Sequence, residues 1–360
     1  MNRKIIIILI LWVWVVSPIS VLEGTAITNN LNIAKIGEIQ TGGSPVDYQI
    51  VNDLIYIADH LGLFIYNVSD PTNPLLVSHC SDLGSSHGIV VTSPYAFIAD
   101  LDYGLEVYNV TNPLSTNEIA TYYYGEGATE LAISDSTCFL LTNTKFISLN
   151  ITNPLSVSKL DEYNISGLFG LDFFITDSYA FVPKWPTGLQ VLDISDPLNI
   201  QLFSSYDIDS FVRTLFIDQE YLYAACATNG FRIYSISNLS APKLIGEYTN
   251  VGNEFGAYGL CKYNNYTLVC DYDEGLKAIE ISDPTTPSLS GSYAGSSFFG
   301  ISVKENNAYF VKGGTDRAIE IVELTVNTSA SSTLSPILII FGLLTSLLYR
   351  KRRNRSFLKK

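Results

Sequence analysis

Short stretches in which apolar and polar residues alternate run through most of the chain. In one representative segment they cover His87–Thr92, Tyr95–Ala99, Leu105–Val110 and roughly Glu118–Tyr123. A period of two is typical of β-strands, and the Gly, Pro, Asn, Asp and Ser residues between the stretches favour turns. The pattern therefore predicts four short antiparallel strands, A to D, in each such segment.

This four-strand pattern repeats along the chain. The shared run begins with Gly-Leu and ends, after alternating apolar residues, in Ser/Thr-Asp/Asn-Pro. Its strongest copies start at Gly62, Gly104, Gly188 and Gly275, and weaker copies start at Lys145, Gly230 and Ala318. Neighbouring starts lie 41 to 45 residues apart. A four-strand unit repeated seven times predicts an all-β fold, a seven-bladed β-propeller with four-stranded antiparallel blades.

The first and last units predict how the ring closes. Residues 32–41 resemble a D strand, although no A, B or C strand precedes them, and the last unit stops at a C strand near 319–326. We therefore expect the N-terminal strand to complete the seventh blade, which removes an open sheet edge.

The repeated run resembles the LVIVD repeat, with Leu189-Gln190-Val191-Leu192-Asp193 as the copy most similar to that pentapeptide. The resemblance covers about residues 31–326. It implies an extracytoplasmic β-propeller of the kind found in prokaryotic secreted and surface proteins. The family carries over no catalytic residue.

The N-terminal residues 1–26 look like a secretory signal peptide. Arg3 and Lys4 precede an apolar run, and Gly24-Thr25-Ala26 is a suitable cleavage site. An uncleaved signal anchor is the alternative, because apolar residues resume after Pro18.

The C-terminal end predicts a membrane anchor. A Ser/Thr-rich stalk at 327–333 leads into an uncharged apolar run at 334–349, and a basic tail follows at 350–360. The apolar run predicts a single transmembrane helix, and the positive-inside rule places the basic tail in the cytoplasm. We therefore expect residues 27–326 to form an ectodomain outside the cell membrane of a prokaryotic envelope.

Charge and composition narrow the classes of partner. The chain of 360 residues has 21 Lys+Arg against 35 Asp+Glu, for a net charge of −14, and the predicted ectodomain alone carries about −22. So acidic a surface argues against nucleic-acid binding and favours cations or basic partners. Five cysteines are too few for a disulfide scaffold, and Cys261 and Cys270, on adjacent predicted strands, leave a disulfide between them open.

The start of each A strand supplies the main candidate site, because A strands are expected to surround the central channel. Aligning the units brings ionisable and aromatic side chains to the channel mouth: Asp47, His87, Glu130, Asp172, Arg213 and Tyr258. That mixture suits a cation, a sugar or a short peptide. The alternative is a hydrated channel in which these charges pair with one another and no ligand binds.

The loops between strands B and C are a second candidate. Two of them are acidic, with Asp100 and Asp102 in one and Asp271 and Asp273 in the other, in the pattern Asp-x-Asp followed by Gly. Weakly bound Ca²⁺ is one interpretation, although no glutamate stands at the twelfth position of a calcium loop. Tight-turn chemistry is the other, and no further cofactor is predicted.

Two smaller features, a tryptophan and a set of sequons, complete the candidate sites. Trp185 replaces the acidic loop of the fourth unit, where it offers a stacking platform for a sugar or a protein, or packs against the next blade. Asn164, Asn265 and Asn327 head Asn-x-Ser/Thr sequons that we expect in loops or in the stalk.

No catalytic motif occurs: the chain has only three histidines, and neither Gly-x-Ser-x-Gly nor His-Glu-x-x-His is present. The sequence therefore predicts a surface binding module for a protein or glycan. A glycan-active hydrolase or lyase that uses the channel-mouth carboxylates is the first alternative, and a structural envelope component is the second.

Overall fold

A computed structural model describes residues 29–328, apart from 82–83, 166–171, 185, 209, 253–254 and 316. The predicted signal peptide, transmembrane helix and basic tail lie outside these residues, as does nearly all of the predicted stalk. Within the described part of the chain, no helix is long and apolar enough to cross a membrane.

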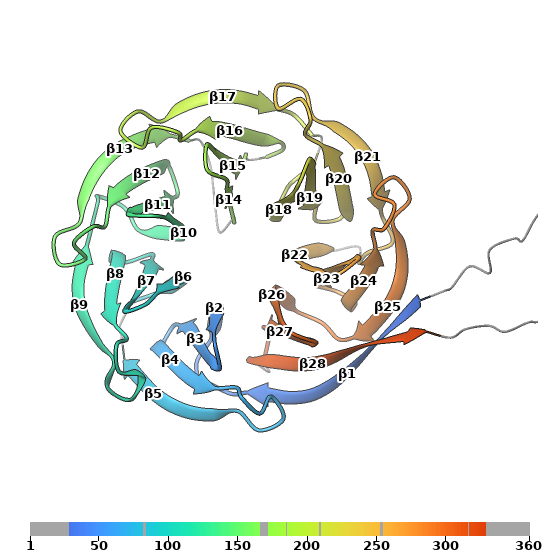
Figure 1. The fold of residues 1–360 in the computed structure, drawn as a ribbon, viewed down its shortest axis with the longest axis horizontal. Helices are drawn as coiled ribbons and strands as arrows, with labels where there is room; N and C mark the ends of the chain where they lie inside the picture. The colour runs from blue at the N-terminus through green and yellow to red at the C-terminus, as the bar shows by residue number, and fades with distance from the viewer. Residues whose placement is uncertain are drawn as a thin grey trace, which may run out of the picture. The chain divides into compact units, whose positions relative to one another are not determined.

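Residues 31–326 form a seven-bladed propeller, which confirms the predicted fold (Figure 1). The strands of the first three blades are β2 (Pro45–Val51), β3 (Leu54–Asp59), β4 (Gly62–Asn67), β5 (Leu75–Ser81), β6 (Ser86–Thr92), β7 (Tyr95–Asp100), β8 (Gly104–Asn109), β9 (Asn117–Tyr122), β10 (Ala128–Ser134), β11 (Thr137–Thr142), β12 (Lys145–Asn150) and β13 (Ser158–Asn164). A short 3₁₀ turn, η1 (Pro113–Ser115), precedes β9. The strands of the second blade start and end within one residue of the predicted A, B, C and D strands.

The other four blades have the same four-strand order. Their strands are β14 (Phe174–Ile175), β15 (Tyr179–Pro183), β16 (Leu189–Asp193), β17 (Gln201–Tyr206), β18 (Thr214–Asp218), β19 (Tyr221–Ala225), β20 (Phe231–Ser235), β21 (Lys243–Tyr248), β22 (Ala257–Tyr263), β23 (Tyr266–Asp271), β24 (Gly275–Glu280), β25 (Ser288–Ala294), β26 (Phe298–Lys304), β27 (Asn307–Lys312), β28 (Ala318–Thr328) and β1 (Asn29–Ile39).

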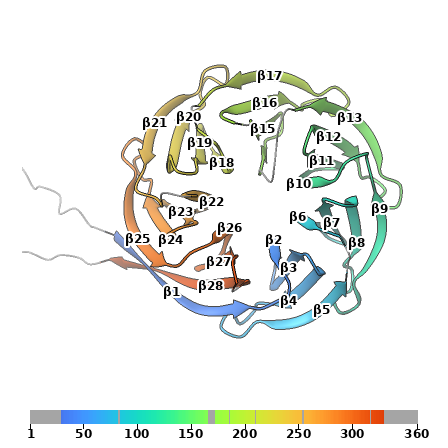
Figure 2. The same ribbon diagram turned by 180° about the vertical axis from the view of Figure 1, so that it is seen from behind.

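The seventh blade closes the ring as predicted. Its order is β1-β28-β27-β26, so the N-terminal strand forms the outer edge beside the last strand of the propeller. Figure 2 shows the two strands side by side from the back of the ring. The Lys35 ammonium of β1 lies 3.4 Å from the buried Glu320 carboxylate of β28. This ion pair joins the first and last strands of the propeller.

Packing between blades explains the pattern of apolar residues. The middle strands are buried on both faces and read as nearly continuous apolar runs, as in β7 and β23, whereas the outer β5 is largely exposed. Seven separate apolar clusters form, one at each junction of neighbouring blades. The core is therefore a ring of interfaces.

The glycine at the start of the strongest copies of the repeat has a backbone reason. Gly62, Gly104, Gly188 and Gly275 have φ between +86° and +115°, in the left-handed region that strains other residues. A Cβ at Gly188 would also lie only 2.2 Å from the carbonyl oxygen of Tyr206 on the neighbouring D strand. The glycine permits both the turn after strand B and the close approach of strand D.

Candidate functional site

The seven innermost strands surround the central channel (Figure 1), and at one end of it lies a cavity of about 400 Å³. Every blade contributes to its lining. All six predicted channel-mouth residues are among the lining residues: Asp47, His87, Glu130, Asp172, Arg213 and Tyr258. The structure therefore brings the whole predicted set together. Its role in binding stays a prediction.

Irregularities at the start of five inner strands turn several of the lining side chains towards the cavity, His87 and Tyr258 among them. In five blades the pairing of strand A with strand B skips one or two residues at this point. Such β-bulges re-aim side chains that would otherwise follow the alternation of the strand. The skipped residues line the cavity, and they include Val46, His87, Thr129, Tyr258 and Phe299.

Three carboxylates form the acidic part of the cavity. Burial raises the pKa of Asp47 to about 6 and that of Asp172 to about 7, and it raises the pKa of Glu130 well above its usual range. Repulsion by Asp47 adds to the effect of burial on both Glu130 and Asp172. Because neighbouring carboxylates disfavour each other's ionisation, the three groups hold protons to a higher pH than isolated acids do.

Backbone amides anchor these acids. The Ile89 N–H of the next blade donates to Asp47 Oδ2 at 2.9 Å, and the Leu131 N–H donates to Glu130 Oε1 at 3.0 Å. Gly88 makes room for the second of these side chains, because a Cβ there would lie 2.4 Å from Glu130 Oε1.

Arg213 supplies a positive charge to the same cavity. Its guanidinium carbon lies 4.0 Å from the centre of the Tyr258 ring and 5.1 Å from that of Phe211, in cation–π contact with both. Its Nε is buried and has no hydrogen-bond partner among the described residues. The backbone amide of Asp172 donates to the Arg213 carbonyl at 3.2 Å, yet the two side chains form no ion pair.

His87 adds a titratable group at the rim. Its ring centre lies 6.3 Å from that of His60 in the first B–C loop. Burial, together with repulsion from His60, lowers the pKa of His87 below its usual value. The imidazole is therefore predominantly neutral at pH 7 and above, where it can donate or accept a hydrogen bond.

Some cavity residues were missed in the sequence. Val311 lines the mouth from β27, and Gly313, Gly314 and Arg317 line it from the B–C loop of the seventh blade. Arg317 directly precedes the weak seventh copy of the repeat, at the position that Glu274 occupies in the sixth. The equivalent residues of the other six copies do not line the cavity, so the repeat pattern gave no signal for Arg317.

The acidic B–C loops are held by the fold itself. Asp100 is fully buried, and its Oδ1 accepts the backbone amides of Asp102 and Tyr103 at 2.7 and 2.8 Å. Asp271, also fully buried, accepts the amides of Asp273 and Glu274 in the equivalent turn. These contacts are those expected from tight-turn chemistry, one of the two interpretations of the acidic loops.

The remaining oxygens of the sixth-blade loop are also in use. Asp271 Oδ2 accepts the Gly252 amide at 3.0 Å and lies 3.0 Å from the Lys277 ammonium. Asp273 Oδ2 accepts the amides of Phe255 and Gly256. Within the described ranges, no three or more His, Cys, Asp and Glu residues are arranged to hold a metal ion.

Trp185 lies outside the described residues. All three candidate glycosylation residues are exposed, but only Asn265 lies in a turn. The expected loop or stalk position is wrong for Asn164, the last residue of β13, and for Asn327 in β28, because each strand runs further than the turn residues suggested. Cys261 pairs with Leu268 across the β22–β23 hairpin, and both Cys261 and Cys270 are free thiols.

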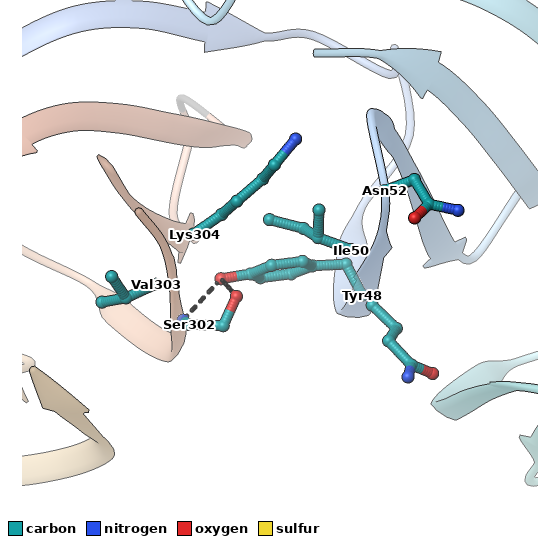
Figure 3. Close-up of a pocket in the computed structure, with 7 residues that line it drawn as sticks. Tyr48, Ile50, Asn52, Ser302, Val303 and Lys304 are labelled. Atoms are coloured by element: carbon teal, nitrogen blue, oxygen red, sulfur yellow. Dashed lines mark hydrogen bonds between the residues drawn. The ribbon is translucent and has the colours of Figure 1, made fainter. Parts of the chain in front are cut away.

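A second cavity, of about 330 Å³, lies at the junction of the first and seventh blades. Figure 3 shows Tyr48 reaching from β2 to Ser302 on β26. The Tyr48 hydroxyl accepts the Ser302 amide at 2.8 Å and donates to the Tyr309 carbonyl, while the Lys304 ammonium pairs with Asp53 at 2.6 Å. Because these groups bind one another, this groove is better explained as the closing seam of the ring than as a ligand site.

Comparison with known proteins agrees with the architecture. The sequence profile of the LVIVD repeat matches residues 42–82, 83–123, 172–208, 212–250 and 259–295, which together make up more than half of the chain. The protein belongs to the LVIVD-repeat family. The five matches coincide with blades one, two, four, five and six of this LVIVD-repeat propeller. No curated protein matches it.

Solved structures show the same fold at low sequence identity. The WD40 β-propeller domain of Doa1 aligns with a TM-score of 0.63 and 10% identity, covering 81% of this chain and 97% of that one. BamB from Moraxella catarrhalis aligns with a TM-score of 0.58 and 10% identity, over 81% and 98% of the two chains. A functionally unknown protein from Desulfotomaculum acetoxidans DSM 771 gives 0.59 and 16%, over 72% and 88%. These likenesses establish the propeller fold of the LVIVD-repeat chain and nothing more.

Proposed function

We propose that this protein is a membrane-tethered, outward-facing binding module that recognises its ligand in the channel-mouth cavity. The two ends of the sequence support the location, since a signal-like segment precedes the propeller and an apolar run with a basic tail follows it. The acidic ectodomain is compatible with a position close to an anionic membrane, which it would not bind.

The observation that carries the binding role is the charged lining of the cavity. The seven blades meet there, and charged side chains from blades one, three, four and five line the same space of about 400 Å³. Ligand sites are commonly concave spaces of this size with a few convergent polar groups and groups of shifted pKa. Here the polar groups converge on the propeller axis.

A capture experiment tests this proposal. Purified full-length protein is immobilised and exposed to surface proteins and to a glycan panel, beside the Asp47→Asn/Asp172→Asn variant. We expect specific partners or ligands to be lost with the variant and kept with Glu323→Gln, which removes an exposed charge outside the cavity. Equal capture by all three proteins would show that the cavity is not the binding site.

The location has its own test. Membrane-impermeant labelling of intact cells should modify propeller lysines such as Lys243, and it should spare lysines of the C-terminal tail such as Lys360. Labelling of the tail in intact cells, or protection of the propeller, would reject the proposed orientation.

One observation favours a second candidate function, glycan hydrolysis. Asp172, with a pKa of about 7, can hold a proton near neutral pH beside another carboxylate. Glycoside hydrolysis requires such a pair, in which one carboxyl is protonated and the other is ionised. Release of reducing ends from a polysaccharide panel by the wild type, and none by Asp172→Asn, would establish the enzyme. No release by the wild type would leave the binding role alone.

A further inference from the structure

The channel-mouth cavity contains charges of both signs that the protein does not pair with each other. Among the described residues, the carboxylates of Asp47, Glu130 and Asp172 form no ion pair, and backbone amides donate hydrogen bonds to them. The Arg213 guanidinium has aromatic contacts but no anionic partner within the same ranges. The lining thus offers an acidic region on blades one, three and four, and basic groups on blades five and seven, Arg213 and Arg317.

Partly buried charges without partners are costly, and a ligand that carries the complementary charges removes that cost. A metal ion would satisfy only the acidic region, which lacks a metal-binding arrangement in the described part of the chain. A simple anion would satisfy only the two arginines and would be repelled by the three carboxylates. A molecule with one positive and one negative group fits both regions.

The cavity also has an apolar wall. Tyr258 and Phe299 line it, with their ring centres 5.0 Å apart in an edge-to-face arrangement. Phe299 packs in turn on Tyr272, at 5.3 Å. The rings are therefore fixed by packing, and they would contact an apolar part of a ligand held between the charged groups.

We propose that the cavity binds a small zwitterion of the amino-acid class with an apolar side chain. The carboxylates of Asp47, Glu130 and Asp172 accept hydrogen bonds from its ammonium group, Arg213 donates to its carboxylate, and its side chain lies against Tyr258 and Phe299. This inference rests on the proposed function and specifies the ligand.

The test measures binding of L-phenylalanine to the full-length protein at pH 8 by isothermal titration calorimetry. Three derivatives divide the two charges: the methyl ester lacks the anion, N-acetylphenylalanine lacks the cation, and N-acetylphenylalanine amide lacks both. We expect the first two to bind at least about tenfold more weakly than L-phenylalanine, because charge-assisted hydrogen bonds are lost. The third should not bind measurably.

Variants assign each charge to its partner. Arg213→Gln should weaken binding of L-phenylalanine about tenfold and abolish the difference between it and the ester. Asp47→Asn keeps an acceptor for the Ile89 amide, and it should reduce the difference between L-phenylalanine and its N-acetyl derivative. Lys243→Gln and Glu323→Gln, which remove exposed charges outside the cavity, serve as matched controls and should bind like the wild type.

Two results overturn the inference. One is the absence of saturable binding by every one of the twenty free amino acids; the other is equal affinity for L-phenylalanine and its ester. If capture of another ligand still depends on Asp47 and Asp172, the proposed function survives and only the zwitterion is rejected. If that capture fails as well, both are rejected.

Discussion

The propeller contains two groups of buried acids, which differ in their hydrogen-bond and ion-pair partners. At the B–C turns, Asp59 accepts the Leu61 amide and the Thr41 hydroxyl, and Asp271 accepts three amides and pairs with Lys277. At the channel mouth, Asp47, Glu130 and Asp172 line one cavity and form no ion pair with any of the described residues.

The difference separates structural acids from functional candidates. A carboxylate whose oxygens accept several hydrogen bonds from its own turn stabilises the folded structure. This holds even where the sequence of the turn resembles a metal-binding loop. Carboxylates that raise one another's pKa destabilise the fold when they are ionised. Clusters of such groups are typical of functional sites, so a ligand explains them better than a structural role does. The following predictions test this division, from the largest expected effect to the smallest.

Replacing Asp271 with Asn should have the largest effect. The substitution leaves the buried Lys277 ammonium without its most buried partner, and breaking a buried pair costs about 3 kcal/mol. Urea denaturation monitored by circular dichroism measures the free energy of unfolding. Glu323→Gln is the control and should change it by less than about 0.5 kcal/mol. A cost for Asp271→Asn as small as the control would show that the turn acids are not structural.

Replacing Asp172 with Asn should have the opposite effect on stability at high pH, raising the free energy of unfolding. The Asp172 pKa is raised from 3.8 to about 7, so at pH 8.5 the folded protein carries a charge that it disfavours. Removing that charge should stabilise the fold by about 1–3 kcal/mol at pH 8.5 and have little effect at about pH 3.5, below both pKa values. The same denaturation measurement at both pH values checks this. Destabilisation at pH 8.5 would place Asp172 with the structural acids.

The wild-type stability should fall as the pH rises from about 4 to about 7. Between their unfolded and folded pKa values, Asp47 and Asp172 bind more protons in the folded state, so deprotonation favours unfolding. His87 acts in the opposite sense because its folded pKa is lowered, but the raised pKa values of the three acids oppose this single shift. Melting temperatures across this range should fall less in the Asp47→Asn/Asp172→Asn variant. Parallel curves for the two proteins would contradict this.

Removal of divalent ions should have the smallest effect. If the turn acids are satisfied by amides and Lys277, EDTA should shift the melting temperature by less than about 1 °C, and added Ca²⁺ should not raise it, because no ion binds the folded state. An increase of several degrees with Ca²⁺ that disappears in Asp271→Asn would instead assign an ion to these loops.

The sequence predicted the blades because the information for them is local. Each turn and strand repeats its own signals, and Gly104 and its counterparts require a backbone conformation that only glycine adopts freely. Alignment of the copies also predicted which six residues meet at the channel mouth, because equivalent residues of a symmetric ring converge on its axis.

The contacts and side-chain directions of those six residues could not be predicted in the same way. The directions of the His87 and Tyr258 side chains change at β-bulges, and no residue pattern indicated the skipped positions. The contribution of Arg317 was hidden because the seventh copy lacks the repeat's glycine. Asn164 and Asn327 were placed wrongly because strand pairing with neighbours extends past the local turn signals.

The closure of the seventh blade by β1 and β28 has a consequence for engineering the chain. Because these neighbouring strands correspond to strands C and D of the other blades, a short linker between Asn29 and Thr328 would turn them into an ordinary hairpin. New ends could then be cut between β8 and β9, whose connecting residues are largely exposed. Such a circular permutant would keep the channel-mouth cavity intact while moving the chain ends from the seventh blade to the second.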